Sequence, residues 1–97
     1  MRFRFDAQKS LEARRKHGVS LRKHGVSLED AEGIFDQAYI VDAKNDNPEQ
    51  FRAIGWAQGR LCSAIFEIGQ DSAGEYYRLV TAWKATAQED QAHAEQV

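Results

Sequence analysis

The stretch FRAIGWAQGRLCSAIFEIGQDSAGEYYRLVTAW, residues 51–83, contains three strand patterns in succession and decides the fold. The runs Phe51–Ala57 and Arg60–Ile68 are joined across Gln58-Gly59, a pair that indicates a tight hairpin turn. A second turn is expected over Gly69–Gly74. The run Glu75–Trp83 is rich in Tyr, Val, Thr and Trp and is the clearest strand of the chain. Together these runs predict an antiparallel meander.

The residues before this stretch predict a strand and two helices. Arg2–Phe5 alternates charged and aromatic side chains, as a short strand does. Asp6 can cap a helix over Ala7 to about Lys16, which Gly18 would end. Ser27 can cap a second helix, because acidic residues follow in its first turn. The apolar residues of that second helix fall on one stripe, namely Leu28, Ala31, Ile34 and Phe35.

The remaining segments complete the predicted order β-α-α-β-β-β-β-α. A strand is expected at Tyr39–Val41, and a polar loop at Ala43–Gln50, which contains the only proline, Pro48. The tail Thr86–Val97, with repeated Ala, Gln and Glu, predicts a C-terminal helix. The fold class is therefore α+β: a short N-terminal strand, two helices, an antiparallel meander of about four strands and a C-terminal helix. We expect the helices on one face of the sheet.

Length and composition favour one globular domain over 1–97. The chain is 42% hydrophobic and 29% charged, and no apolar run approaches the roughly 18 residues that span a bilayer. No apolar segment follows the basic N-terminus, as it would in a secretion signal. The single cysteine, Cys62, lies in an apolar run and is expected to be a buried structural thiol. We therefore expect a cytoplasmic protein without membrane partners.

Charge is distributed unevenly along the chain. Residues 1–28 hold eight Lys or Arg against two acids, a net charge of +6, whereas residues 29–97 hold five against thirteen, a net charge of −8. A basic end on an acidic body can mark a surface for nucleic acid or for an acidic partner. The same pattern also fits a solvated helix face, with part of the charge doubled by a repeat.

That repeat is the heptapeptide Arg-Lys-His-Gly-Val-Ser-Leu, which occurs in tandem at residues 15–21 and 22–28. Seven residues advance an α-helix by nearly two full turns, so an inserted copy keeps the helical phase. Either the first helix continues through Gly18, or it ends there and residues 19–26 form a loop. We expect the second copy to occupy the native position, because Ser27 must cap the second helix.

Several motifs in series resemble the BrnT family. The first are Phe3-x-Phe5-Asp6-x-x-Lys9, then Lys-His-Gly-Val-Ser-Leu, Glu29-Asp30-Ala31 and Ile34-Phe35-Asp36. The later ones are Ile54-Gly55, Gly59-Arg60-Leu61 and Arg78-Leu79-Val80-Thr81-Ala82-x-Lys84-Ala85. They follow in order along nearly the whole chain.

This resemblance implies the toxin of a type II toxin–antitoxin pair, with a compact RelE-like fold. The implied activity is that of a metal-independent endoribonuclease, which needs no cofactor and inhibits translation by cleaving RNA. The implied partner is a BrnA-like antitoxin with a ribbon-helix-helix DNA-binding domain. The toxin would then contact RNA directly and DNA only through the antitoxin.

Candidate site residues follow from the chemistry of RNA cleavage through the 2′-hydroxyl. That reaction needs a proton acceptor, a proton donor and cations around the phosphorane, for which Arg and Lys are suited. Each candidate also fits a structural role: a surface charge for the lysines, a helix cap for the histidine, a charge with a buried stem for the arginine of the last strand. The candidates at motif positions are Lys9, His24 (or His17 in the other repeat copy), Arg60, Arg78 and Lys84.

Several positions depart from the family pattern. Trp83 and Gln50 stand where many members have an arginine, Ala13 replaces an asparagine, and His93 stands near a usual tyrosine. The strand end at residues 66–69 also lacks a common arginine. Trp83 and Trp56 could stack on bases, although strand tryptophans are more often core or interface anchors. Because fewer cations weaken phosphate binding, the alternative function is a weakened or inactive toxin fold that acts in antitoxin binding and operon autoregulation.

Overall fold

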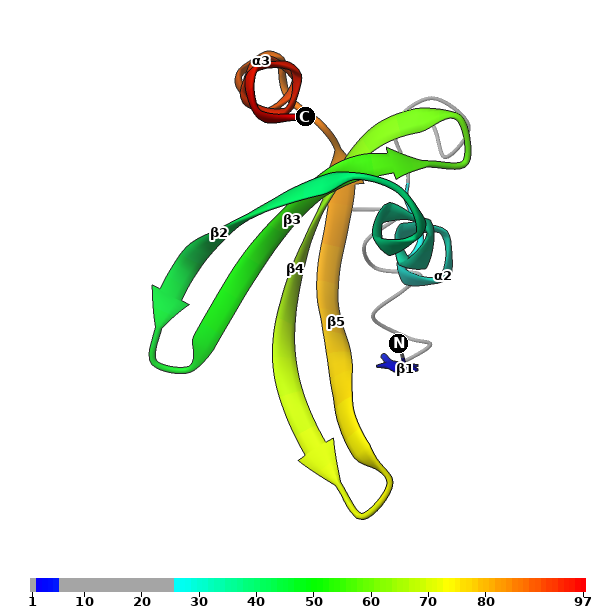
Figure 1. The fold of residues 1–97 in the computed structure, drawn as a ribbon, viewed down its shortest axis with the longest axis vertical. Helices are drawn as coiled ribbons and strands as arrows, with labels where there is room; N and C mark the ends of the chain where they lie inside the picture. Colours follow the sequence, from blue (N-terminus) through cyan, green and yellow to red (C-terminus); the bar gives the residue numbers. More distant parts are fainter. Residues whose placement is uncertain (1, 6–25) are drawn as a thin grey trace.

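The computed structural model describes residues 2–5 and 26–97, which form an α+β fold around one five-stranded sheet (Figure 1). The strands lie in the order β1-β5-β4-β3-β2. β2 to β5 form the predicted antiparallel meander, whereas the N-terminal strand β1 is parallel to β5. The sheet is therefore mixed. The element bounds are β1 Arg2–Arg4, α2 Leu28–Ala31, η1 Glu32–Asp36, β2 Tyr39–Asp46, β3 Glu49–Ala57, β4 Arg60–Asp71, β5 Gly74–Lys84 and α3 Ala87–Gln96.

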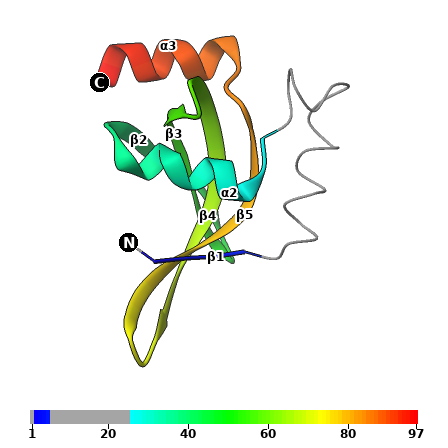
Figure 2. The same cartoon turned by 90° about the vertical axis from the view of Figure 1, so that its right-hand side faces the viewer.

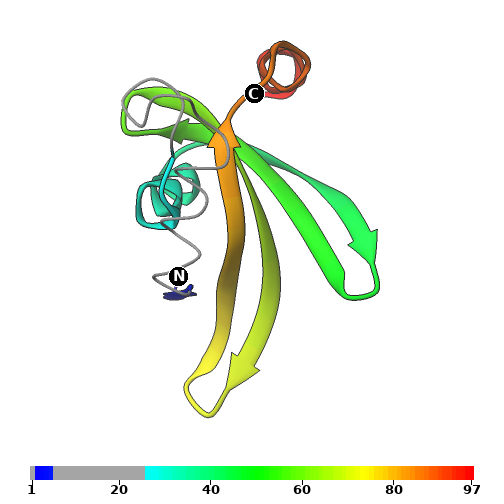
Figure 3. The same ribbon diagram turned by 180° about the vertical axis from the view of Figure 1, so that it is seen from behind.

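The four strands of the meander are longer than the sequence predicted, whereas β1 ends at Arg4, one residue before the predicted Phe5. The expected loop Ala43–Gln50 was wrong in extent, because β2 runs to Asp46 and β3 begins at Glu49, with a cis Asn47–Pro48 peptide between them. The expected turn Gly69–Gly74 shrinks to Ser72 and Ala73. Main-chain pairing with a neighbouring strand keeps these polar residues extended. The two long hairpins diverge toward their tips (Figure 3).

The turn at Gln58-Gly59 is the tight hairpin turn that was predicted. Both residues have positive φ, 53° and 75°, which suits a two-residue turn of type I′. Strand β4 pairs with β3 from this turn without a register shift, so that Ala57 faces Arg60 and Gly55 faces Cys62. The register puts one set of small and apolar residues on one face of the sheet.

That face carries the hydrophobic core, and α2 with η1 covers it. Ser27 caps α2 as predicted: its hydroxyl accepts a hydrogen bond of 3.0 Å from the Asp30 amide. The predicted apolar stripe is buried at Leu28, Ala31 and Ile34. The helix itself is short, because the chain continues as a 3₁₀ helix from Glu32. The helix predicted over Ala7–Lys16 and the first repeat copy lie outside the described residues.

β1 is held on the sheet by ring packing on this same face. The ring of Phe35, on η1, lies 5.3 Å from that of Phe3 and 5.3 Å from that of Tyr77. Phe66 lies 5.4 Å from Phe35 and 4.7 Å from Tyr77. These tilted and edge-on pairs add specific contacts to apolar burial. The side chain of Phe3 therefore anchors a strand of only three residues.

α3 lies on the opposite face, so the expectation of helices on one face was wrong. Its buried side chains are Glu89 and His93 rather than apolar ones. Glu89 accepts hydrogen bonds from the Trp83 indole at 2.9 Å and from Arg52 at 3.2 Å. These two residues alternate along their strands with core residues, and they point away from α2. Figure 2 shows α3 at one end of the sheet and the tip of the β4–β5 hairpin at the other.

Close packing of η1 on β3 predicts that Gly55→Ala destabilises the protein. A Cβ at this position would lie 2.9 Å from Tyr39 Cβ and 3.1 Å from Ile34 Cγ2. We expect the free energy of unfolding, measured by urea denaturation, to fall by about 1–3 kcal/mol because of this overpacking. Gly33→Ala is the control, since its Cβ would come no closer than 3.4 Å to Ala57. Equal losses in the two variants would contradict this explanation.

The polar attachment of α3 predicts a large effect of Glu89→Ala. The substitution removes the acceptor of the Trp83 indole and one of the two carboxylates that bind Arg52, which keeps its ion pair with Asp42. We expect a loss of about 1–3 kcal/mol in the free energy of unfolding. Glu95→Ala, an exposed change on the same helix, should change it by less than about 0.5 kcal/mol. If Glu89→Ala were as mild as Glu95→Ala, the carboxylate would not be what attaches α3.

Candidate functional site

Arg78 lies in a row of polar residues that crosses the sheet on the α3 face. On one side it pairs in register with Arg4 of β1, and on the other with Glu67 of β4. Gln50, on β3, donates a hydrogen bond of 2.8 Å to Glu67 Oε2. Among the described residues, none forms a hydrogen bond or ion pair with the exposed Arg78 guanidinium. The row thus places a predicted site arginine next to a second arginine and a carboxylate in the register of the sheet.

The row borders an open cavity of about 500 Å³, here called the Arg78 cleft. The cavity begins where the chain leaves the sheet after β1 and extends across β5 and β4. A bulge at Val80 interrupts the pairing of β5 with β4 and adds an apolar wall beside the arginines. The lining residues are Arg4, Phe5, Gln50, Glu67, Tyr76, Arg78, Leu79 and Val80.

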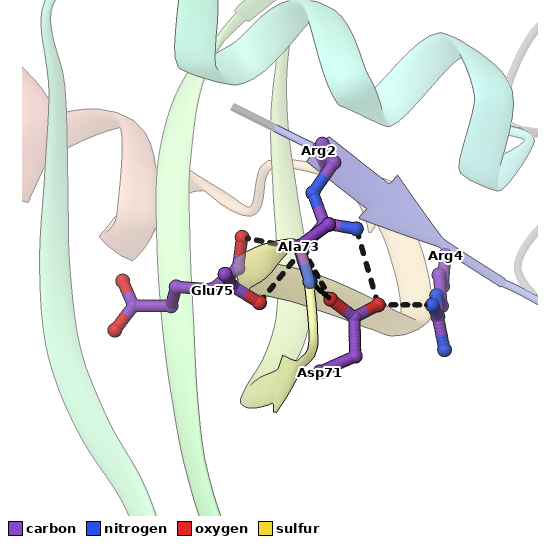
Figure 4. Close-up of polar contacts among 6 residues, drawn as sticks. Arg2, Arg4, Asp71, Ala73 and Glu75 are labelled. Atoms are coloured by element: carbon purple, nitrogen blue, oxygen red, sulfur yellow. Dashed lines mark hydrogen bonds and ion pairs between the residues drawn. The ribbon is translucent and has the colours of Figure 1, made fainter.

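Asp71 binds both Arg2 and Arg4, and these three residues are here called the clamp (Figure 4). The clamp holds Arg4 in the cleft. The Asp71 carboxylate accepts hydrogen bonds of 3.1 and 2.8 Å from Arg2, and it also pairs with Arg4. The Arg4 guanidinium lies 4.3 Å from the centre of the Tyr76 ring. On β4, Gly69 leaves room for that ring, because a Cβ there would overlap it. The clamp therefore joins β1, the hairpin tip and one wall of the cleft.

Hydrogen bonds set the charge state of this clamp. The hydrogen bond from Arg2 lowers the pKa of Asp71 to about 2, well below its ordinary value of 3.8, against a smaller opposing effect of desolvation. The amide of Ala73 adds a hydrogen bond of 2.9 Å to the same carboxylate. Asp71 is therefore ionised at any pH at which the protein would ordinarily work.

Arg60 and Lys84 lie away from the Arg78 cleft. Arg60 begins β4 and Lys84 ends β5, where it pairs with Cys62. Both belong to the face that carries α2, and Lys84 lies six residues beyond Arg78, about 20 Å along the strand. Of the predicted site residues, the structure thus places Arg78 in a cleft and the other two at the opposite end of the sheet. Lys9 and His24 (with His17) lie outside the described residues.

Two other residues that the sequence singled out, Cys62 and Trp83, have structural roles. Cys62 is buried as predicted, and burial raises the pKa of its thiol. Trp83 donates its indole N–H to Glu89, which fits the anchor interpretation rather than base stacking. Burial alone would raise the pKa of Glu89, but hydrogen bonds from the Thr86 amide and from Trp83 outweigh it and lower that pKa. Trp56 is 46% exposed and stays available for stacking.

Three residues of the cleft, Arg4, Glu67 and Tyr76, were not among the predicted site residues. Arg4 was assigned to a short strand whose partner was not predictable. Glu67 was noted only because its strand end lacks an arginine. Strand alternation did contain a signal, because Tyr76 and Arg78 lie two residues apart on one face. The register with β1 and β4 was needed to bring the others beside them.

Neither a metal site nor a membrane span is found in the described segments. Residues 2–5 and 26–97 contain no group of three or more His, Cys, Asp or Glu side chains that could hold a metal ion. No helix in these segments is both long and apolar enough to cross a membrane.

The lowered pKa of Asp71 predicts an acid-sensitive contribution to stability. A carboxylate with a depressed folded-state pKa stabilises the protein above its unfolded-state pKa, and that stabilisation is lost as pH falls through the folded value. We expect wild type to be more stable than Asp71→Asn at pH 5, and the difference to shrink between pH 4 and pH 2. Urea unfolding at each pH measures this difference. The control, Asp46→Asn, changes an exposed carboxylate. A difference that is constant across this range would contradict the clamp.

Comparisons with known proteins add no family assignment. A scan against models of protein families finds no match to the chain, and a search of curated proteins finds none either.

Proposed function

We propose that the protein is an endoribonuclease toxin of the BrnT type, acting in the cytoplasm at the Arg78 cleft. The observation that carries this proposal is the row Arg4–Arg78–Glu67 in one open cavity. Two guanidinium groups can hold a phosphodiester, and a carboxylate beside them can accept a proton. An α+β fold with an antiparallel meander agrees with the small-toxin fold that the sequence motifs imply.

The proposed reaction is the attack of a ribose 2′-oxygen on the adjacent phosphorus. Glu67 accepts the proton of the 2′-hydroxyl while the bond between the 2′-oxygen and phosphorus forms. Arg78 and Arg4 stabilise the negative charge that grows on the phosphorane oxygens. The bond between phosphorus and the 5′-oxygen then breaks, and that oxygen takes a proton from the Tyr76 hydroxyl or from water in the open cleft. The products are a 2′,3′-cyclic phosphate and a 5′-hydroxyl.

The geometry around Glu67 suits a proton acceptor. Gln50 donates to Oε2 and so fixes the orientation of the carboxylate. None of the described residues donates a hydrogen bond to Oε1, which leaves that oxygen for a substrate hydroxyl. Arg78 is the neighbouring residue across the β4–β5 pair, so the acceptor and the phosphate-binding cation lie side by side. Positioning of this kind is a large part of catalysis in a preorganised site.

The proposed partner is a BrnA-like ribbon-helix-helix antitoxin. In this scheme the toxin binds RNA by itself and reaches operator DNA only through the antitoxin.

One observation favours the second candidate, a toxin fold that binds its antitoxin without cleaving RNA. Arg60 and Lys84 do not join Arg78, so the described candidate cations do not converge on one point. A site with fewer cations stabilises the phosphorane less. In this second candidate the fold serves in antitoxin binding and autoregulation.

Cleavage assays with matched variants test the proposal. Purified protein should cleave RNA in the presence of EDTA, and Glu67→Gln should slow cleavage by about 10²–10⁴-fold because it removes the proton acceptor. Arg78→Gln should lower kcat by about 10²–10³-fold. The controls Glu49→Gln and Lys44→Gln change exposed charges outside the cleft and should cleave at the wild-type rate.

Induction in cells separates the two candidates. Wild type should arrest growth, co-expression of the proposed BrnA-like antitoxin should relieve the arrest, and the Glu67→Gln and Arg78→Gln variants should not arrest growth. A wild-type protein that accumulates, binds the antitoxin and cleaves no RNA would refute the nuclease and support the binding candidate.

A further inference from the structure

The β1–β5 pair places two like charges directly opposite each other. Arg4 and Arg78 are partners in the parallel register, and both line the same cavity. Like charges side by side on one face of a sheet repel each other. β1 is an edge strand of three residues, so it has few main-chain bonds to offset this repulsion. Asp71 offsets the charge of Arg4, but among the described residues no ion pair offsets that of Arg78, so an anion that contacts both guanidinium groups would remove the remaining repulsion.

In the part of the chain that the structure describes, the charges around this pair do not cancel. Three guanidinium groups, those of Arg2, Arg4 and Arg78, face two carboxylates, those of Asp71 and Glu67, which leaves one positive charge. Asp71 is shared between Arg2 and Arg4. Glu67 accepts a hydrogen bond from the neutral amide of Gln50. An anion that enters the cavity therefore meets a local positive field although the whole chain is acidic.

Such an anion would contact two strands at once. Arg4 reaches the cavity only while β1 is docked, with Phe3 packed against Phe35 and Arg2 bound to Asp71. Arg78 belongs to β5, which is also paired with β4, so we expect its position not to depend on β1. Bidentate contacts of arginine to phosphate are strong and directional, so a phosphoryl group suits the space between the two side chains.

We propose that Arg4 and Arg78 together bind one phosphoryl group, and that this binding and the docking of β1 on β5 stabilise each other. The coupling is reciprocal, since a ligand that binds only the docked state shifts the population toward it. The inference rests on the proposed function for its natural ligand, a phosphodiester of RNA, but the binding of an anion does not require cleavage.

Thermal unfolding and hydrogen exchange test the coupling with inorganic phosphate as the probe. At phosphate concentrations about tenfold above Kd, and against sodium chloride of equal ionic strength, Tm of wild type should rise by about 5–10 °C. Amide exchange in residues 2–5 should slow at the same phosphate concentrations. Both effects should be lost in Arg4→Gln and in Arg78→Gln and retained in Lys44→Gln.

Arg78→Gln is the decisive variant, because it leaves the contacts of β1 with Asp71 and Phe35 intact. A phosphate effect on Tm or on exchange that persists in Arg78→Gln would overturn the proposal. The absence of any effect in wild type would overturn it as well.

A second experiment distinguishes binding of free phosphate from binding of a phosphodiester. An uncleavable 2′-O-methyl RNA oligonucleotide should slow exchange in residues 2–5 at lower concentrations than inorganic phosphate does, and Arg78→Gln should weaken its binding about tenfold or more. An oligonucleotide that binds without slowing exchange in residues 2–5 would overturn the coupling. RNA cleavage without any phosphate effect would refute this inference and leave the proposed function standing. A phosphate effect without RNA cleavage would support this inference and refute the proposed nuclease.

Discussion

The ion pairs of Asp71 with Arg2 and Arg4 are the contacts on which the functional arrangement of this protein depends. They join the N-terminal strand to the tip of the β4–β5 hairpin, at the edge of the sheet. A three-residue strand has too few main-chain hydrogen bonds to stay docked by pairing alone. Ring packing of Phe3 on Phe35 adds apolar contact on the other face. The outcome is that Arg4 is brought beside Arg78 and becomes part of a cavity.

One face of the sheet carries the hydrophobic core, and the other carries the proposed active site. The face under α2 holds the small and aromatic core residues, and its close approach to η1 depends on Gly55. The opposite face has α3 at one end, attached through the Glu89 carboxylate, and the Arg78 cleft at the other. Because neighbouring residues of a strand point to opposite faces, each strand contributes to both. A polar cleft can therefore adjoin a compact core without burying unpaired charges in it.

Much of the fold followed from local sequence patterns. The hairpin turn at Gln58-Gly59, the Ser27 cap and the C-terminal helix were predicted, and the structure confirms them, because turn and cap preferences act over a few residues. Strand ends were less accurate, since pairing extends a polar strand beyond its apolar pattern. The parallel docking of β1 and the position of α3 on the far face were not predictable, because both depend on contacts between distant residues.

The candidate site, like the fold, was predictable from the sequence only in its local features. The sequence by itself determined that Arg78 is a strand arginine with Tyr76 on the same face, because alternation is a property of any strand. Only the tertiary structure decided which residues stand beside it. Register brought Arg4 and Glu67 to Arg78, while the length of β5 separated Lys84 from it. The physical reason is that a sheet gathers residues by strand order and register, neither of which is written in a local stretch of sequence.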